Sequence, residues 1–414
     1  MRVVAYSLEP WGCPMNMLRL VAPMRAADIE LIHGNEGHDV HPSRIDGADL
    51  VVVCRDFPRL VVSFEDILQR ARLAGKPLIY ETDDLLQALP PEHPDHARGY
   101  YDDAAIPMLH AIVSADAVTT STPLLRDTLR LLNPQCHLLE NYLIDDFWFP
   151  ASNIDGPSPV NSAASDPIEL GYMGGNSHVP DLAMVENALH RVLNQYGERV
   201  RLRLIGLGAT EKLRTLSNVE VVDLAPQLPD KTYAGFASWF HRQHFDVLLG
   251  PLRDNLFNRC KSAIKFLEYS SLAAATLFSR VGPYAAMVRS EETGLLASTV
   301  DDFEQSLVRL IEDAPLRARL GDNALRHARD TMRLSLHAHK WREAYEHILR
   351  RKSRVATRNR SCRRAELIDT IAVDGLAYLS RMRQRENAVT QELRSIHASK
   401  AWKLVKAIWR LIPG

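Results

Sequence analysis

The chain has 414 residues, of which 46% are hydrophobic and 24% are charged, and its formal net charge is −1. This composition is typical of a globular protein with two or three domains. The five cysteines are scattered and odd in number, which argues against a disulfide framework or a zinc site and favours a reducing cytoplasm. No apolar run approaches the roughly eighteen residues of a membrane span.

Residues 1–150 alternate short apolar runs with helical patterns. Such alternation is typical of a parallel sheet with helices on both faces, so we predict an α/β domain with a doubly wound sheet. The predicted strands cover 2–7, 29–33, 50–54, 77–81, 117–120 and 137–140, and the predicted helices include 64–74, 106–114 and 123–132.

Polar residues follow the first and fourth of these strands. Arg19 comes after the first, and Asp83 with Asp84 after the fourth. Because ligands of such sheets gather beyond the carboxyl ends of the strands, all three are candidates for binding a ligand. Two adjacent carboxylates rarely aim at one ion, so a metal site is disfavoured. The remaining alternatives for the aspartates are hydrogen bonding to a ligand and capping of a helix in the LLQAL segment that follows.

A linker and a second alternating domain come next. Residues 151–166 are rich in Ser, Pro, Asn and small side chains, which is typical of a linker. The second domain, 167–335, opens with a strand that runs into Gly174, Gly175 and Asn176. Glycines at such a junction let the backbone approach a ligand, although a double glycine is also common in ordinary loops. Further strands are predicted at 201–205, 219–222 and 246–249, with helices at 301–312 and 316–329.

The most informative part of this domain reads as a strand, a polar loop and a helix over about 263–274, with Ser262 as the helix N-cap. Free N–H groups and the helix dipole favour an anion at such an N-terminus. Lys261 and Lys265 are four residues apart and Glu268 follows three further on, so by helical spacing all three would share one face. Two cations and a carboxylate one turn deeper suit a diphosphate followed by a ribose diol. A solvated Lys/Glu face on an ordinary helix is the alternative.

The string NxxKSxxKxLEY, from Asn258 to Tyr269, resembles the donor-site segment of glycosyltransferases with the GT-B fold, of the family 4 or group 1 type. The resemblance implies that Glu268 binds the nucleotide ribose. Many members carry a second glutamate, which contacts the donor sugar, at the position of Cys260. Asn258 or Lys261 is therefore expected to substitute for it here.

The resemblance extends to other segments. It implies that Gly174, Gly175 and His178, with the neighbouring Asn176, face the donor diphosphate and sugar. The segment around Asn141 is similar to the end of the family's acceptor domain. A helix at 336–350 resembles the last GT-B helix, which crosses back onto the first domain.

The resemblance implies two Rossmann-like domains that face a cleft, with the acceptor on the first and the nucleotide-sugar donor on the second. The expected reaction moves a sugar from a nucleoside diphosphate to a glycan or lipid-linked acceptor in bacterial cell-surface polysaccharide synthesis, with retention of anomeric configuration. Lys261 and Lys265 would be catalytic, because they can stabilise the charge that grows on the leaving diphosphate. No metal or other cofactor is expected. The alternatives are an inactive scaffold in a polysaccharide assembly complex and a GT-B sugar-nucleotide epimerase.

The tail, 351–414, is basic. From residue 350 to the end there are 16 Lys and Arg against 5 Asp and Glu, while the rest of the chain has a net charge of −12. Residues 395–414 form a predicted amphipathic helix with Trp402 and Trp409 on its apolar side, which suits peripheral binding to an anionic membrane surface. The alternative is a helix docked on the acidic body. Nucleic-acid binding is disfavoured, because no stacking platform or recognition fold accompanies the charge.

Overall fold

The computed structural model describes residues 1–150, 167–228, 230–356 and 391. The described residues up to 356 belong to one compact unit. The linker predicted at 151–166 and the amphipathic helix predicted at 395–414 lie outside the described residues. Among the described residues, no helix is both long and apolar enough to cross a bilayer.

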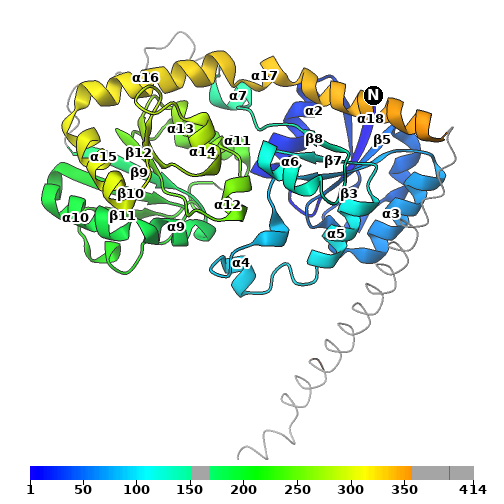
Figure 1. Ribbon diagram of the computed structural model, residues 1–414, viewed down its shortest axis with the longest axis horizontal. Helices are drawn as coiled ribbons and strands as arrows, with labels where there is room; N and C mark the ends of the chain where they lie inside the picture. The colour runs from blue at the N-terminus through cyan, green and yellow to red at the C-terminus, as the bar shows by residue number, and fades with distance from the viewer. Residues whose placement is uncertain (151–166, 229, 357–390, 392–414) are drawn as a thin grey trace, which may run out of the picture. The chain divides into compact units, whose positions relative to one another are not determined.

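Two open parallel sheets of six strands form the framework (Figure 1). The first has the order β2-β1-β5-β6-β7-β8 and all its pairs are parallel. Its strands are β1 (Arg2–Tyr6), β2 (Glu30–His33), β5 (Leu50–Cys54), β6 (Leu78–Thr82), β7 (Ala117–Thr120) and β8 (Cys136–Leu138). The central strands β5, β6 and β7 are buried along their whole length, as expected for a parallel sheet covered on both faces. A short antiparallel pair, β3 (Asn35–Glu36) and β4 (Asp39–Val40), comes between β2 and β5 in the chain.

The second sheet has the order β11-β10-β9-β12-β13-β14 and is also parallel throughout. This is the doubly wound order of dinucleotide-binding folds, in which the direction of winding reverses between the first and fourth strands. Its strands are β9 (Ile168–Met173), β10 (Val200–Ile205), β11 (Val219–Val222), β12 (Val247–Gly250), β13 (Ala275–Ser279) and β14 (Leu295–Ala297). The reversal lies between β9 and β12, which are hydrogen-bonded neighbours.

Helices cover both sheets. The first domain carries α1 (Pro14–Asn16), α2 (Ala22–Ala26), α3 (Val61–Leu73), α4 (Pro94–Ala97), α5 (Ala105–Ser114), α6 (Pro123–Leu129) and α7 (Asp145–Trp148). The second carries α9 (Val179–Met184), α10 (Glu186–Tyr196), α11 (Tyr233–His241), α12 (Leu256–Cys260), α13 (Ile264–Ser270), α14 (Gly282–Met287), α15 (Val300–Glu312), α16 (Ala314–Thr331) and α17 (Leu334–His337).

The final described helix, α18 (His339–Ala356), lies against the first domain although it follows the second in sequence (Figure 1). The indole N–H of Trp341 donates to the backbone carbonyl of Arg19 at 3.1 Å, and Arg342 Nε donates to the carbonyl of Ala27 at 2.9 Å. One apolar cluster continues from the first sheet through Trp148 and Trp341 to α11 and α13 of the second domain. The two domains therefore share buried contacts on the side where the chain crosses between them.

The helix predicted at 263–274 starts one residue before α13 and ends too late, because α13 stops at Ser270. The loop predicted before it contains a further short helix, α12, after which Lys261 adopts an extended backbone conformation. Ser262 does not cap α13, because the N-cap position is Ala263 and no side chain bonds to the first turn. The Ser262 hydroxyl instead accepts a hydrogen bond from Asn141 Nδ2 at 2.9 Å. Lys261 therefore does not lie on one helical face with Lys265 and Glu268.

Candidate functional site

The site lies beyond the carboxyl ends of β9 and β12, at the reversal of the second sheet, where ligands of such sheets bind. After β9 the chain passes Gly174 and turns into a short 3-10 helix that ends at His178. A Cβ atom on Gly174 would lie 2.9 Å from His178 Cδ2, so the absence of a side chain at 174 lets the imidazole pack close to the backbone. The neighbouring Gly175 and Asn176 are exposed at this edge.

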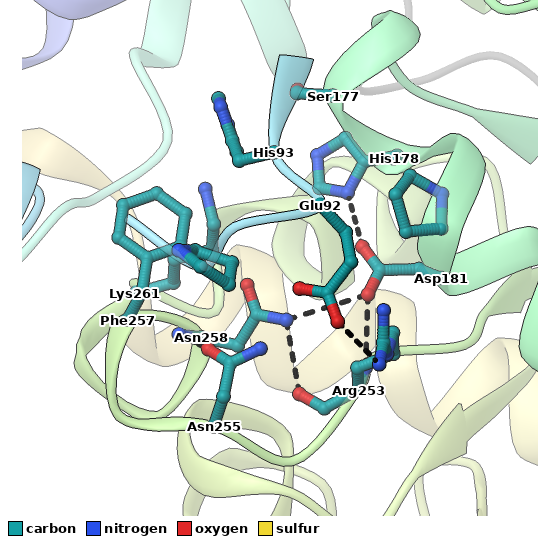
Figure 2. Close-up of a pocket in the computed structure, with 12 residues that line it drawn as sticks. Glu92, His93, Ser177, His178, Asp181, Arg253, Asn255, Phe257, Asn258 and Lys261 are labelled. Atoms are coloured by element: carbon teal, nitrogen blue, oxygen red, sulfur yellow. Dashed lines mark hydrogen bonds and ion pairs between the residues drawn. The ribbon is translucent and has the colours of Figure 1, made fainter. Parts of the chain in front are cut away.

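Asp181, on α9, is the centre of a hydrogen-bond network that joins the two strand ends (Figure 2). Its Oδ2 lies 2.9 Å from His178 Nδ1, and its Oδ1 accepts from the backbone N–H of Arg253 at 2.9 Å and from Asn258 Nδ2 at 3.3 Å. Asn258 Nδ2 also donates to the carbonyl of Arg253 at 2.9 Å. One buried carboxylate thus fixes the position of His178 and of the loop after β12.

The pKa of His178 is lowered to about 4, chiefly by burial and next by the nearby Lys265 ammonium group, against the opposing effect of Asp181. The imidazole is therefore neutral at pH 7. A carboxylate can only accept a hydrogen bond, so the single ring proton lies on Nδ1, and Nε2 is left as an acceptor.

The two candidate catalytic lysines occupy different environments. Lys261 Nζ lies 3.7 Å from Asp84 Oδ2 of the first domain and 4.5 Å from the centre of the Phe257 ring. Lys265 is only 8% exposed, and its ammonium lies 4.9 Å from the centre of the Tyr172 ring, within range of a cation–π contact. Burial lowers the pKa of Lys265 to about 8.

Glu268 lies one turn after Lys265 on α13 and is also buried. The hydroxyl of Tyr233, on α11, donates to Glu268 Oε1 at 2.6 Å, and the indole N–H of Trp148 donates to the Tyr233 hydroxyl at 3.2 Å. Burial raises the pKa of Glu268 to about 7, although the Tyr233 hydrogen bond and Lys265 both lower it. One oxygen of this carboxylate is therefore held in place by a chain of donors that begins on α7 of the first domain.

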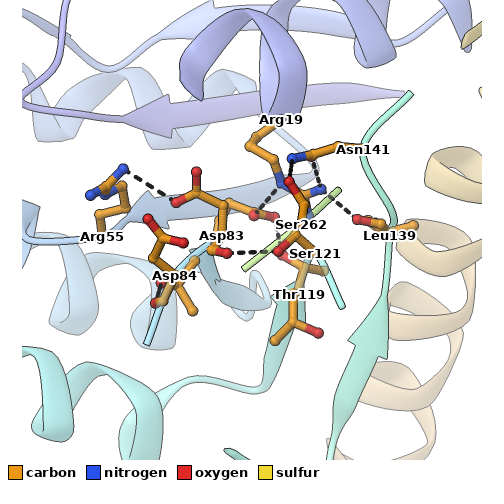
Figure 3. Close-up of polar contacts among 12 residues, drawn as sticks. Arg19, Arg55, Asp83, Asp84, Thr119, Ser121, Leu139, Asn141 and Ser262 are labelled. Atoms are coloured by element: carbon orange, nitrogen blue, oxygen red, sulfur yellow. Dashed lines mark hydrogen bonds and ion pairs between the residues drawn. The ribbon is translucent and has the colours of Figure 1, made fainter. Parts of the chain in front are cut away.

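On the first-domain side, Asp83 and Asp84 are bound by cations (Figure 3). Asp83 Oδ1 lies 3.3 Å from Arg55 Nη1, and its carbonyl accepts from the Ser121 hydroxyl at 2.6 Å. Burial raises the pKa of Asp83; burial would also raise that of Asp84, but Lys261 lowers it below its usual value. The capping alternative for the aspartates is wrong, because the following 3-10 helix begins after Leu85 with no side-chain cap.

Arg19 is fully buried and holds the interior of the domain together (Figure 3). Its Nε donates to Glu81 Oε1 at 2.8 Å, and its Nη1 donates to Asn141 Oδ1 at 2.8 Å and to the carbonyl of Leu139. Asn141 in turn donates to Ser262 of the second domain. Asn141 thus links Arg19 of the first domain to Ser262 of the second.

Sequence reasoning missed four residues that the structure brings into this region: Asp181, Tyr233, Trp148 and Arg55. Only Asp181 had a visible signal, since its spacing of three from His178 places both at the start of one helical segment. Arg55 has a φ of 46°, a left-handed conformation that is rare for a side chain of this size and that turns the chain sharply after β5.

Two cavities meet at Lys261. One is polar, encloses only about 20 Å³, and is lined by His93 of the first domain and by His178, Asp181 and Asn258 of the second. The other measures about 390 Å³ and has a largely apolar wall that includes Ile264 and Leu267. Within the part of the chain that the structure describes, no group of three or more His, Cys, Asp or Glu side chains is placed to hold a metal ion.

Several solved structures are similar to this chain. HepE from Anabaena, in complex with UDP, is 12% identical, with coverage of 84% of this chain and 100% of that chain and a TM-score of 0.57. Sucrose-phosphate synthase from Thermosynechococcus elongatus is 14% identical, with coverage of 84% and 98% and a TM-score of 0.56. WaaG, a glycosyltransferase involved in lipopolysaccharide biosynthesis, is 14% identical, with coverage of 83% and 98% and a TM-score of 0.52.

The chain has the GT-B fold. No protein-family model and no curated protein matches the sequence. At identities of 12–14% the likeness establishes the fold, and the reaction must be argued from the site itself. In GT-B terms, β9 and β12 belong to the second Rossmann-like domain, and the two cavities lie between it and the first.

Proposed function

We propose that the protein is a glycosyltransferase that uses a nucleoside-diphosphate sugar. The observation that carries this proposal is the buried pair Lys265 and Glu268, one turn apart on α13 with Lys265 over Tyr172 of β9. Lys261, four residues before Lys265, lines both cavities between the domains. Two cations can bind a diphosphate there, and a carboxylate can accept hydrogen bonds from the two ribose hydroxyls. HepE, of the same fold, has been solved with UDP-glucose bound.

In the proposed reaction an acceptor hydroxyl oxygen forms a bond to the anomeric carbon. The bond from that carbon to the β-phosphate oxygen breaks, and its electron pair stays on the phosphate. The acceptor proton passes to the leaving phosphate or to solvent. Lys261 and Lys265 stabilise the charge that develops on the diphosphate. We propose that this needs no metal cofactor, so turnover should be unchanged in EDTA, and that the anomeric configuration is retained.

The larger cavity suits an acceptor with an apolar portion. It lies between α6 of the first domain and α13 and α14 of the second, with Leu124 and Met287 at its wall. Lys261 reaches both cavities, so an acceptor in the larger one would have its polar end beside the donor diphosphate. A glycan carried on a lipid fits this arrangement. WaaG, which acts in lipopolysaccharide biosynthesis, supports a role in bacterial surface polysaccharides.

Thermal unfolding with a panel of nucleoside diphosphates is the first test. A ligand at 100 times its dissociation constant adds about 2.7 kcal/mol to the free energy of unfolding, which is readily seen as a higher Tm. Turnover of the matching sugar nucleotide, with and without acceptor, then separates the candidates. An epimerase converts the donor without acceptor, and an inactive scaffold releases no nucleoside diphosphate. No stabilisation by any member of the panel would contradict the proposal.

The pH profile of kcat/KM for the donor should be a narrow bell. In the free protein, Glu268 must be ionised to accept from ribose, and its pKa is about 7. Lys265 must be protonated, and its pKa is about 8. Activity should therefore rise through the first value and fall through the second. Since the two groups interact, the apparent pKa values of the acid and alkaline limbs belong to the pair and not to either residue alone.

Replacement of Tyr233 by phenylalanine, which removes a donor to Glu268, should move the acid limb to higher pH. An acid limb that does not move would contradict this role of Tyr233.

We propose that the basic tail binds the cytoplasmic face of the membrane. Its charge and its two tryptophans should attract it to anionic lipid, by about 1 kcal/mol for each basic residue near the surface. The full-length protein should therefore co-sediment with vesicles that contain phosphatidylserine. High salt should release it, because the Debye length falls from about 10 Å at 0.1 M to about 3 Å at 1 M. A chain that ends at residue 394 should bind much less yet still turn over a soluble acceptor. Unfolding on truncation, with vesicle binding retained, would favour a tail docked on the protein body.

A further inference from the structure

Cys260 takes the place at which many GT-B relatives carry a sugar-contacting glutamate, and the structure shows where its side chain goes. Cys260 is fully buried and belongs to the apolar core of the first domain. Its carbonyl accepts a hydrogen bond from the Thr122 hydroxyl at 2.8 Å. Residue 260 therefore anchors the two domains to each other and does not line the polar cavity.

The substitutes expected from the sequence are largely occupied. Asn258 donates from its amide nitrogen to both Asp181 and the carbonyl of Arg253. Lys261 lies beside Asp84 and over Phe257. His178 offers an acceptor whose position is fixed, because Asp181 engages its Nδ1 and leaves Nε2 unprotonated. Figure 2 shows the ring with one edge at Asp181 and the other turned toward the space between the labelled residues.

We propose that His178, held in one tautomer by Asp181, recognises the transferred sugar by accepting a hydrogen bond at Nε2 from a hydroxyl group on the sugar ring of the donor. The inference rests on the proposed function and deepens it. His178 contacts the substrate directly, whereas Asp181 is a positioning residue that acts through the imidazole. The cavity that His178 lines is polar and lies next to Lys261, which is where the sugar would follow the diphosphate.

The cavity must open to admit a sugar, since about 20 Å³ is room for roughly one water molecule. Across its mouth, Arg253 Nη2 lies 3.2 Å from Glu92 Oε1 of the first domain, and the two side chains are 39% and 50% exposed. An ion pair so exposed is weak in water. Separation of the loop at Glu92 from the second domain is therefore an accessible step. It would leave the hydrogen bond between His178 and Asp181 intact, because both residues belong to the second domain.

The test compares affinities for UDP, GDP, ADP and dTDP with those for their glucose conjugates by calorimetric titration. For the wild type, the glucose conjugate of the nucleotide that binds should bind more tightly than the nucleotide alone. Replacement of His178 by alanine should lower the affinity for the glucose conjugate about fivefold, which is the contribution of one neutral hydrogen bond. The affinity for the nucleoside diphosphate itself should stay unchanged. His178→Gln should restore part of the increment, because an amide oxygen can accept.

Asp181→Asn is the sharper variant. The amide oxygen can keep the contacts to Arg253 and Asn258, while the amide nitrogen donates to Nδ1 and forces the ring proton onto Nε2. The sugar increment should then fall as in His178→Ala, with the Tm little changed. His190→Ala, at a partly exposed position of α10 that lines neither cavity, serves as the surface control. An increment that is unchanged in His178→Ala would overturn the inference, and so would wild-type protein that binds its nucleotide and the glucose conjugate of that nucleotide equally tightly. Wild-type protein that binds no nucleotide at all would contradict the proposed function itself, and the inference would fall with it.

Discussion

Replacement of Glu268 by alanine is expected to reduce nucleoside diphosphate affinity by roughly 10- to 150-fold, the equivalent of about 1.5–3 kcal/mol for a hydrogen bond to a charged group. The carboxylate is 6% exposed, and Tyr233 holds Oε1 at 2.6 Å. It is therefore preorganised, and the ribose would meet an acceptor that needs no reorientation. Calorimetric titration of the wild type and the variant measures the loss.

Two controls separate binding from folding in this experiment. Glu198→Ala changes an exposed carboxylate between α10 and β10 and should leave affinity unchanged. Glu268→Gln keeps the volume and can still accept from Tyr233, so its Tm should stay close to that of the wild type while affinity falls. Unchanged affinity in Glu268→Ala would remove this residue from the donor site.

The central strands were predictable because parallel strands buried on both faces read as continuous apolar runs. The predicted bounds 117–120 agree with β7, which is buried along its whole length. The bounds 219–222 agree with β11, an edge strand whose residues are exposed or only partly buried. The predicted helix at 263–274 starts within one residue of α13, but neither α12 nor the extended backbone at Lys261 before it was predicted. Thr122 of the first domain donates to the carbonyl of Cys260, and Asn141 donates to Ser262, so contacts with the other domain flank Lys261 on both sides. The sequence of one segment does not contain that information.

The same limit applies to the site. Lys265 and Glu268 could be proposed because they lie one turn apart within one recognisable segment. Tyr233 could not, since it meets Glu268 across 35 residues of sequence, and Trp148 lies a further 85 residues from Tyr233. Asp83 and Asp84 were identified as a pair, but their partners Arg55 and Lys261 come from another strand end and from the other domain. Residues that position a functional group are thus harder to predict than the group itself.

Replacement of Lys265 by alanine is expected to lower kcat by roughly 100- to 1000-fold, as does the loss of one preorganised donor at a developing negative charge. Among the described residues no ion pair engages the Lys265 ammonium group, which lies buried over Tyr172. Such a cation, already stripped of water, gains most when the leaving diphosphate takes up its full charge. Donor affinity should therefore fall much less than kcat, because that charge is smaller in the ground state.

Comparison of kcat with the donor dissociation constant decides between catalysis and simple binding. Lys265→Arg retains the positive charge but not the compact ammonium, and it should recover affinity more fully than turnover. Lys212→Ala, where the side chain binds Asn187 at the surface at 2.5 Å, serves as the matched control and should change neither quantity. Equal losses in kcat and affinity for Lys265→Ala would mean that the lysine binds the ground state only. In that case Lys261, which lies in the cleft beside Asp84 and would exchange that carboxylate for the diphosphate, would be left as the residue that stabilises the leaving group.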